Sequence, residues 1–249
     1  MIYPVFHCNG SIKTKVEREM IAQGENMALV KAFVLLNIKL LLQDKISFLW
    51  SISMPTIMLL IQKNSIAHQP HILGFWWTYI AVCSFLFGIG IYALRLRESG
   101  VLRVVFSINK APMYFFLGLL GTQIVFAFTV LVVFNLIACL LFHFNFFVLL
   151  WQSIIVMLCC LPVAFAGYNL TGINRLHANS THTLASIIVF IAFLLMATNK
   201  EFNILWKLYQ MFVNNTWQAF LFYILGSIII ILISLPTIIR FKCISAERR

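Results

Sequence analysis

Few side chains in this sequence could carry out chemistry, and they do not combine into a catalytic or metal site. His68 and His71 are three residues apart, a spacing that two metal ligands on a helix can use, but no carboxylate or thiol accompanies them. Ser227 follows Gly226 in an apolar stretch, where an intramembrane serine protease would hold its nucleophile, yet no histidine lies in any apolar stretch to act as the base. We therefore predict no catalytic residue, no metal site and no enzymatic activity in this chain.

Six apolar stretches cross the chain, and none has an Asp, Glu, Lys, Arg or His at its centre. Such groups are costly inside a bilayer and usually mark proton relays or ion paths, so their absence argues against ion coupling. The chain is 62% hydrophobic and 10% charged, whereas soluble domains are about 45–50% apolar and about 25% charged. Composition and span length predict an all-α polytopic membrane protein. The expected spans are residues 46–62, 74–94, 111–142, 147–168, 183–198 and 217–239.

The basic residues mark one side of the membrane. They crowd the N-terminal region, the segment between the second and third spans, and the end of the chain, whereas the opposite loops hold only Lys63, Lys200 and Lys207. The positive-inside rule therefore predicts that both termini are cytoplasmic. The net charge of +11 arises mostly from this asymmetry. Because the cations lie at membrane boundaries, they match the anionic headgroups of the lipid bilayer rather than nucleic acid.

The first 27 residues differ in composition from the rest of the chain. They are mixed and charged, and they lack the short apolar core of a secretory signal. We expect residues 1–27 to be either a cytoplasmic tail or leader sequence upstream of a true start. That start would be Met20 or Met27 instead of Met1.

Residues 28–45 are apolar but contain Lys31 and Lys39. Long lysine stems can lie along apolar surface while their charges stay in water, which predicts a helix in the cytoplasmic interface. The alternative is a seventh span, which would place the basic N-terminus outside. Residues 28–242 are expected to form one transmembrane domain, followed by a cytoplasmic tail at 243–249.

The second and third spans and the segment before the last span each predict a position relative to the membrane. Trp76 and Trp77 open the second span in an aromatic cluster, which predicts a belt at the outer interface. The stretch 111–142 would extend about 48 Å as a helix, against a bilayer core of about 30 Å, so it either tilts strongly or begins in the cytoplasm. Residues 199–216 mix aromatic and charged side chains and predict short helices on the outer leaflet.

Uncharged polar residues also occur within the spans, and Gln123 and Asn135 in the third span are the ones of most interest. One interpretation is that they form hydrogen bonds between helices, which stabilise packing. The other is that they line a weakly polar path for an amphipathic substrate.

The segment between the second and third spans contains Arg97, Glu98, Gly100 and Arg103, with Pro112 at the third span. This pattern resembles the type-2 ABC exporter permeases, which carry an Arg-Glu pair, a Gly two residues on, an Arg three residues beyond it and then a Pro. The expected layout is also similar to theirs: an interfacial helix, six spans, internal termini and an outer re-entrant segment.

The resemblance covers about residues 28–242, with two departures. In the family the outer segment before the last span usually contains prolines, and residues 199–216 have none. Residues 1–27 have no clear counterpart. The re-entrant shape of the outer segment and the role of the N-terminal residues are therefore open.

The resemblance implies that a cytoplasmic ATPase binds the segment around Gly100. Arg97, Glu98 and Arg103 would supply surface charge that sets the register of the contact, and Leu102 would supply apolar grip. The alternative is a basic loop that lies on lipid. No phosphate-binding loop of the Gly-Lys-Ser/Thr type occurs in the sequence. ATP and Mg²⁺ are therefore expected on separate ABC ATPase subunits, with no cofactor in this chain.

The resemblance also implies a bacterial cytoplasmic membrane location and a second permease copy, as a homodimer or a heterodimer. The neutral, aromatic-rich spans favour an amphipathic or hydrophobic cargo, such as a peptide, a bacteriocin, a drug or a lipid-linked molecule. Immunity to a peptide antibiotic is the first expectation. The alternative is a membrane scaffold or immunity protein that transports nothing.

Overall fold

The computed structural model describes residues 30–35, 37–39, 45–63, 66, 72–100, 102, 106, 112–173, 176–198 and 217–239. All regular structure in these residues is helical, which confirms the expected all-α class. The two predicted tails, Arg103 and the segment 199–216 lie outside the described residues.

Three helical stretches are long and apolar enough to cross a membrane, which indicates membrane association. They are Ile72–Glu98, Pro112–Phe142 and Phe146–Gly172, and shorter apolar helices cover Ile52–Ile61, Ala178–Ile191 and Tyr223–Ile239.

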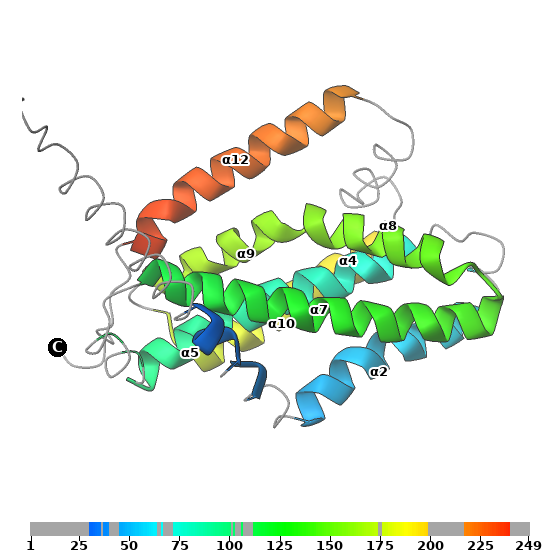
Figure 1. Cartoon of the computed structure of the whole chain (residues 1–249), viewed down its shortest axis with the longest axis horizontal. Coiled ribbons are helices and arrows are strands. Elements are labelled where there is room, and N and C mark those ends of the chain that lie inside the picture. Colours follow the sequence, from blue (N-terminus) through cyan, green and yellow to red (C-terminus); the bar gives the residue numbers. More distant parts are fainter. Residues whose placement is uncertain are drawn as a thin grey trace, which may run out of the picture.

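The helices lie roughly along one axis, and α7 extends through the whole length of the bundle (Figure 1). At 31 residues, α7 is about 46 Å long. It begins at Pro112, where the missing N–H of proline costs nothing. In chain order the elements are α2 (Lys45–Ile61), α4 (Ile72–Phe85), η1 (Leu86–Ile91), α5 (Tyr92–Glu98), α7 (Pro112–Phe142), α8 (Phe146–Cys159), α9 (Leu161–Tyr168), η2 (Asn169–Gly172), α10 (Ala178–Thr198) and α12 (Trp217–Ile239).

Two of the expected spans contain an interruption that the apolar pattern did not predict. The second continues to Glu98, and its middle part, η1, is a π-helix. The fourth breaks at Cys160, because Pro162 cannot donate a hydrogen bond and the N–H of Val163 bonds to the carbonyl of Cys160 at 3.0 Å. The fifth begins at Ala178 instead of residue 183.

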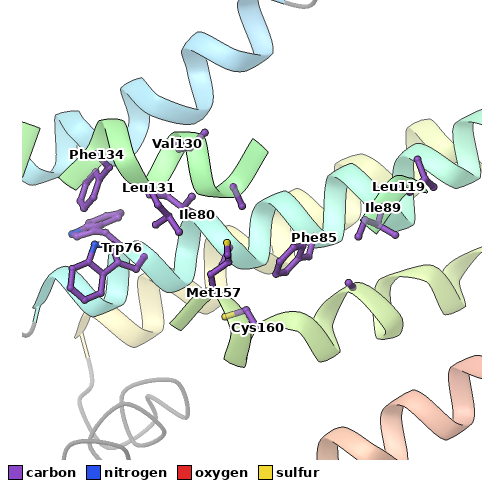
Figure 2. Close-up of a cluster of buried hydrophobic side chains, with 14 of the residues drawn as sticks. Trp76, Ile80, Phe85, Ile89, Leu119, Val130, Leu131, Phe134, Met157 and Cys160 are labelled. Atoms are coloured by element: carbon purple, nitrogen blue, oxygen red, sulfur yellow. The ribbon is translucent and has the colours of Figure 1, made fainter. Parts of the chain in front are cut away.

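The core is formed by α4, η1, α7, α8 and α9. Figure 2 shows Phe85 and Ile80 of α4 facing Leu131 of α7, Met157 of α8 and Cys160 at the α8–α9 break. By contrast, α10 and α12 lie at the periphery and expose large apolar side chains along their length. Leu184, Ile188, Leu225 and Ile233 are examples. In a membrane protein, such surfaces are suited to lipid.

The described residues between 30 and 39 are helical and pack against α7. The ring of Phe33 meets that of Phe115 edge-on, with centroids 5.9 Å apart. Its Cβ occupies the space that a side chain on Gly118 would fill. The location of this segment at the membrane interface stays a prediction.

A close backbone approach in the core joins η1 to α9. A Cβ atom on Gly90 would overlap the backbone carbonyl of Gly167. Two turns of backbone therefore meet with no side chain between them. Small residues allow such contacts in membranes, where helices associate by close packing instead of by the hydrophobic effect.

We predict that Gly90→Ala lowers the free energy of unfolding by about 1–3 kcal/mol, because the added methyl group meets backbone that cannot rotate away. Gly226→Ala in α12 is the matched control, since its added Cβ has no atom within 4 Å apart from its chain neighbours and the nearby backbone of its own helix. It should leave stability unchanged or raise it by about 1 kcal/mol. Thermal unfolding of both variants in detergent measures the difference, and equal shifts would contradict the close approach.

Candidate functional site

The charged residues that the structure brings together lie at one end of the bundle. There, α5 ends beside η2 and the start of α10 (Figure 1). Arg97 and Glu98, the last two residues of α5, bind these neighbouring elements. We call Arg97, Glu98 and the groups that they bind the clamp.

Arg97 is buried, with only 3% of its surface exposed. Its guanidinium donates to the backbone carbonyls of Thr171, Ile173 and Leu176. The last two distances, from Nη2, are 3.3 and 3.2 Å. Nη1 also donates to Ile173 at 3.4 Å. A guanidinium has five N–H donors in a fixed plane, so one side chain can hold several carbonyls of a turn together.

Glu98 binds the start of α10. Its Oε1 accepts a hydrogen bond from the backbone N–H of Ala178 at 2.8 Å. The same oxygen lies 3.7 Å from Nδ1 of the exposed His177. The first N–H groups of a helix have no partner within the helix, and a negative charge there also complements the helix dipole. Glu98 therefore caps α10 from a distant part of the chain.

The order of the two charges matches the polarity of the helices that they bind. Arg97 faces carbonyls within and just after η2, which continues from α9, and the partial charge at such a helix end is negative. Glu98 faces the start of α10, where the partial charge is positive. Neighbouring residues of opposite sign thus satisfy one helix end and the next helix start.

Gly100 ends α5 in the left-handed region, with φ of 75°. Glycine adopts this conformation without a steric penalty and is the common residue just past a helix end. Beyond it, Leu102 and Phe106 are both buried and four residues apart, as on one face of a helix. The ring of Phe106 meets that of Phe115 edge-on, with centroids 5.8 Å apart. The chain therefore turns at Gly100 and packs back onto α7.

Of the predicted coupling residues, Arg97 and Glu98 bind the same connection, and Gly100 ends α5. Leu102 is buried in the core instead of being exposed for a partner, and Arg103 is outside the described part. Arg97 differs from the expectation of a surface charge, because its partners are carbonyls inside the fold. Sequence reasoning missed Ala178 and the three carbonyls as partners. Backbone groups leave no signal in the sequence, and the adjacency of Arg and Glu was the only hint.

The second polar cluster joins three helices within the core. Trp77 of α4 donates from Nε1 to Oδ1 of Asn135 at 2.8 Å, and Nδ2 of Asn135 donates to Oγ of Ser153 in α8 at 2.9 Å. Asn135 has no exposed surface. These contacts favour the packing interpretation for Asn135. Trp76 and Trp77 are buried, whereas the expected aromatic belt would expose them at the outer interface.

Gln123 is 6% exposed and lies over η1. A Cβ atom on Gly88 would overlap its amide group, so the absence of a side chain at Gly88 makes room for it. The π-helix is a rare conformation that is often found at functional sites. Of the two residues predicted to line a substrate path, Gln123 therefore remains the candidate.

Comparison with protein-family models, curated proteins and solved structures finds no match to the chain.

We predict that exchanging the two charges, as Arg97→Glu with Glu98→Arg, destabilises the protein by at least about 3 kcal/mol. The exchange keeps one positive and one negative residue side by side. The polarity of the helix ends does not change, so each charge then faces a helix end of its own sign. Unfolding of the single and double variants in detergent measures the effect. Recovery of stability in the double variant would contradict the role assigned to helix polarity. Arg95→Glu, on an exposed residue of α5, is the control and should change stability by less than about 0.5 kcal/mol.

We predict that Asn135→Leu lowers the free energy of unfolding by about 1–2 kcal/mol, because it leaves Trp77 and Ser153 without their shared partner. Ser153→Ala should cost less, since Asn135 keeps its bond to Trp77. Thermal unfolding and the tryptophan emission spectrum check both variants. An unchanged melting temperature for Asn135→Leu would argue against a packing role.

Proposed function

We propose that this chain is the membrane-spanning permease subunit of a bacterial ATP-driven ABC exporter. It crosses the cytoplasmic membrane six times with both termini inside, and the clamp lies at the cytoplasmic end. It pairs with a second permease copy and binds two cytoplasmic ATPase subunits, which hold ATP and Mg²⁺.

The observation that carries the proposal is the form of the segment that follows α5. Gly100 ends α5 in the left-handed region, and Leu102 and Phe106 are buried against the bundle. The contact of Phe106 with Phe115 attaches this segment to α7, which supports a coupling loop over a loop that merely rests on lipid. A segment fixed at both ends to membrane helices can carry a displacement from a bound partner into the spans, as a coupling loop must.

The neutral interior supports an external source of energy. The buried polar side chains of the described core are amides, hydroxyls, two indoles and a thiol, and the buried Arg97 lies at the end of the bundle. Transport coupled to protons or ions uses acidic or basic groups within the spans. ATP hydrolysis on a partner needs none.

The proposed cargo is amphipathic or hydrophobic. The described core is rich in aromatic rings, and Gln123 offers a single amide beside the π-helix. A peptide antibiotic, a drug or a lipid-linked molecule combines a large apolar surface with a few hydrogen-bonding groups. Export of such a peptide would make the producing cell immune to it.

Co-expression with an ATPase encoded in a neighbouring reading frame tests the proposal. The two proteins should co-purify from membranes, and the complex should hydrolyse ATP. Arg103→Glu should reduce the ATPase recovered with the permease about tenfold, because a reversed charge at an interface weakens binding by roughly 1.4 kcal/mol or more. Arg103 is better suited to this test than Glu98, whose reversal would also uncap α10.

Lys63→Glu is the matched control, since it reverses the charge of an exposed residue on the expected outer side. It should leave both co-purification and turnover unchanged. Failure of the wild-type chain to retain an ATPase would overturn the exporter and favour a membrane protein that transports nothing. Equal effects of Arg103→Glu and Lys63→Glu would overturn the assignment of the segment after α5 as the ATPase-binding loop.

A further inference from the structure

The described contacts of α10 with the rest of the chain are concentrated near its start. Ala178 is buried and bonded to Glu98, and the ring of His182 lies 5.2 Å from that of Phe87 in η1. Farther along, α10 exposes Leu184 by 61% and Phe190 by 57%. A displacement at the start of α10 is therefore passed to this helix through its described contacts.

The end of α5 is also where the turn before α10 is fixed. Arg97 binds carbonyls of η2 and of the connection that follows it, at Thr171, Ile173 and Leu176. Glu98 holds the first turn of α10 itself. Because hydrogen bonds to charged groups are short-ranged and directional, they keep these parts in one geometry.

We infer that Arg97 and Glu98 form a mechanical link through which a displacement of the end of α5 moves α10. The apolar contacts of Leu102 and Phe106 can slide along α7, but the clamp cannot shift without breaking its hydrogen bonds. Arg97 and Glu98 are then positioning residues within the permease, and Arg97 does not contact the ATPase. The use of this movement in transport rests on the proposed function, whereas the link itself does not.

Hydrogen–deuterium exchange of the purified full chain in nanodiscs tests the link without any partner. In Arg97→Gln, the amides of residues 176–184 should exchange about tenfold faster than in wild type, since the bonds that hold the connection are lost. Amides of α7 should keep their wild-type rates, which separates local release from global unfolding. Arg95→Gln is the matched control, because this arginine is exposed on the same helix. Equal rates in Arg97→Gln and Arg95→Gln would overturn the inference.

Arg97→Lys gives a second, milder variant if Arg97→Gln does not fold. Lysine keeps the positive charge but cannot hold three carbonyls in one plane. Its rates for residues 176–184 should lie between those of wild type and Arg97→Gln. Rates equal to wild type would show that charge alone holds the connection and would overturn the role of the guanidinium fork.

The complex with the ATPase tests the transmission of movement. Ser180→Cys, on an exposed position of α10, is labelled with a maleimide in a chain whose native cysteines are replaced. A non-hydrolysable ATP analogue with Mg²⁺ should change the labelling rate severalfold, and Arg97→Gln should abolish that change while the ATPase stays bound. A change that survives Arg97→Gln would overturn the link. If no ATPase binds the wild-type chain, the proposed function fails and the exchange experiment still decides the link.

Discussion

The structure depends on the hydrogen bonds made to unpaired backbone groups at the end of one helix and at the start of the next, beside an apolar bundle. A helix end leaves four carbonyls without partners, and a helix start leaves four N–H groups. Between η2 and α10 these two sets lie close together, and leaving them unpaired in a low-dielectric environment would be costly. Arg97 satisfies the carbonyls of Thr171 and Ile173 in the first set, and Glu98 satisfies the N–H of Ala178 in the second. Because both come from the end of α5, this pairing also fixes where α5 stands relative to η2 and α10.

The interior follows the rules of a membrane bundle more than those of a soluble core. Lipid tails are as apolar as the helix surfaces, so burial of apolar area hardly favours contact between helices over contact with lipid. Specific contacts must therefore determine how the helices pack. The backbone approach at Gly90 and Gly167 is one such contact, and the bonds from Trp77 through Asn135 to Ser153 are another. On the far side, α12 is attached by Tyr223, which donates to the carbonyl of Cys159. The break at Pro162 leaves that carbonyl without its usual helical partner, since the N–H of Val163 bonds to Cys160.

The sequence was sufficient for features that depend on composition or on the special geometry of one residue. The all-helical class follows from apolar content, and the start of α7 follows from Pro112. The burial of Trp77 was not predictable, because its partner Asn135 is 58 residues away and tryptophan is common both at interfaces and in cores. The π-helix was equally hidden, since Gly88 and Gly90 acquire their roles only once Gln123 and Gly167 lie against them. Arg97 was recognised as important but expected at the surface, because an arginine that binds backbone carbonyls looks the same in sequence as one that binds a partner.

Burial of Arg97 changes how a coupling loop should be understood. If all its charges faced a partner, reversing any of them would weaken binding alone. Arg97 and Glu98 are instead engaged within the chain, so their charges fix neighbouring helices. Near the start of α10, the two residues hold the connection and the first turn at the same time. If the proposed ATPase displaces the end of α5, the clamp would carry that movement to α10 more directly than the apolar contact of Phe106 with Phe115 would carry it to α7. The neutral spans could then change their packing without any ionisable group crossing the membrane.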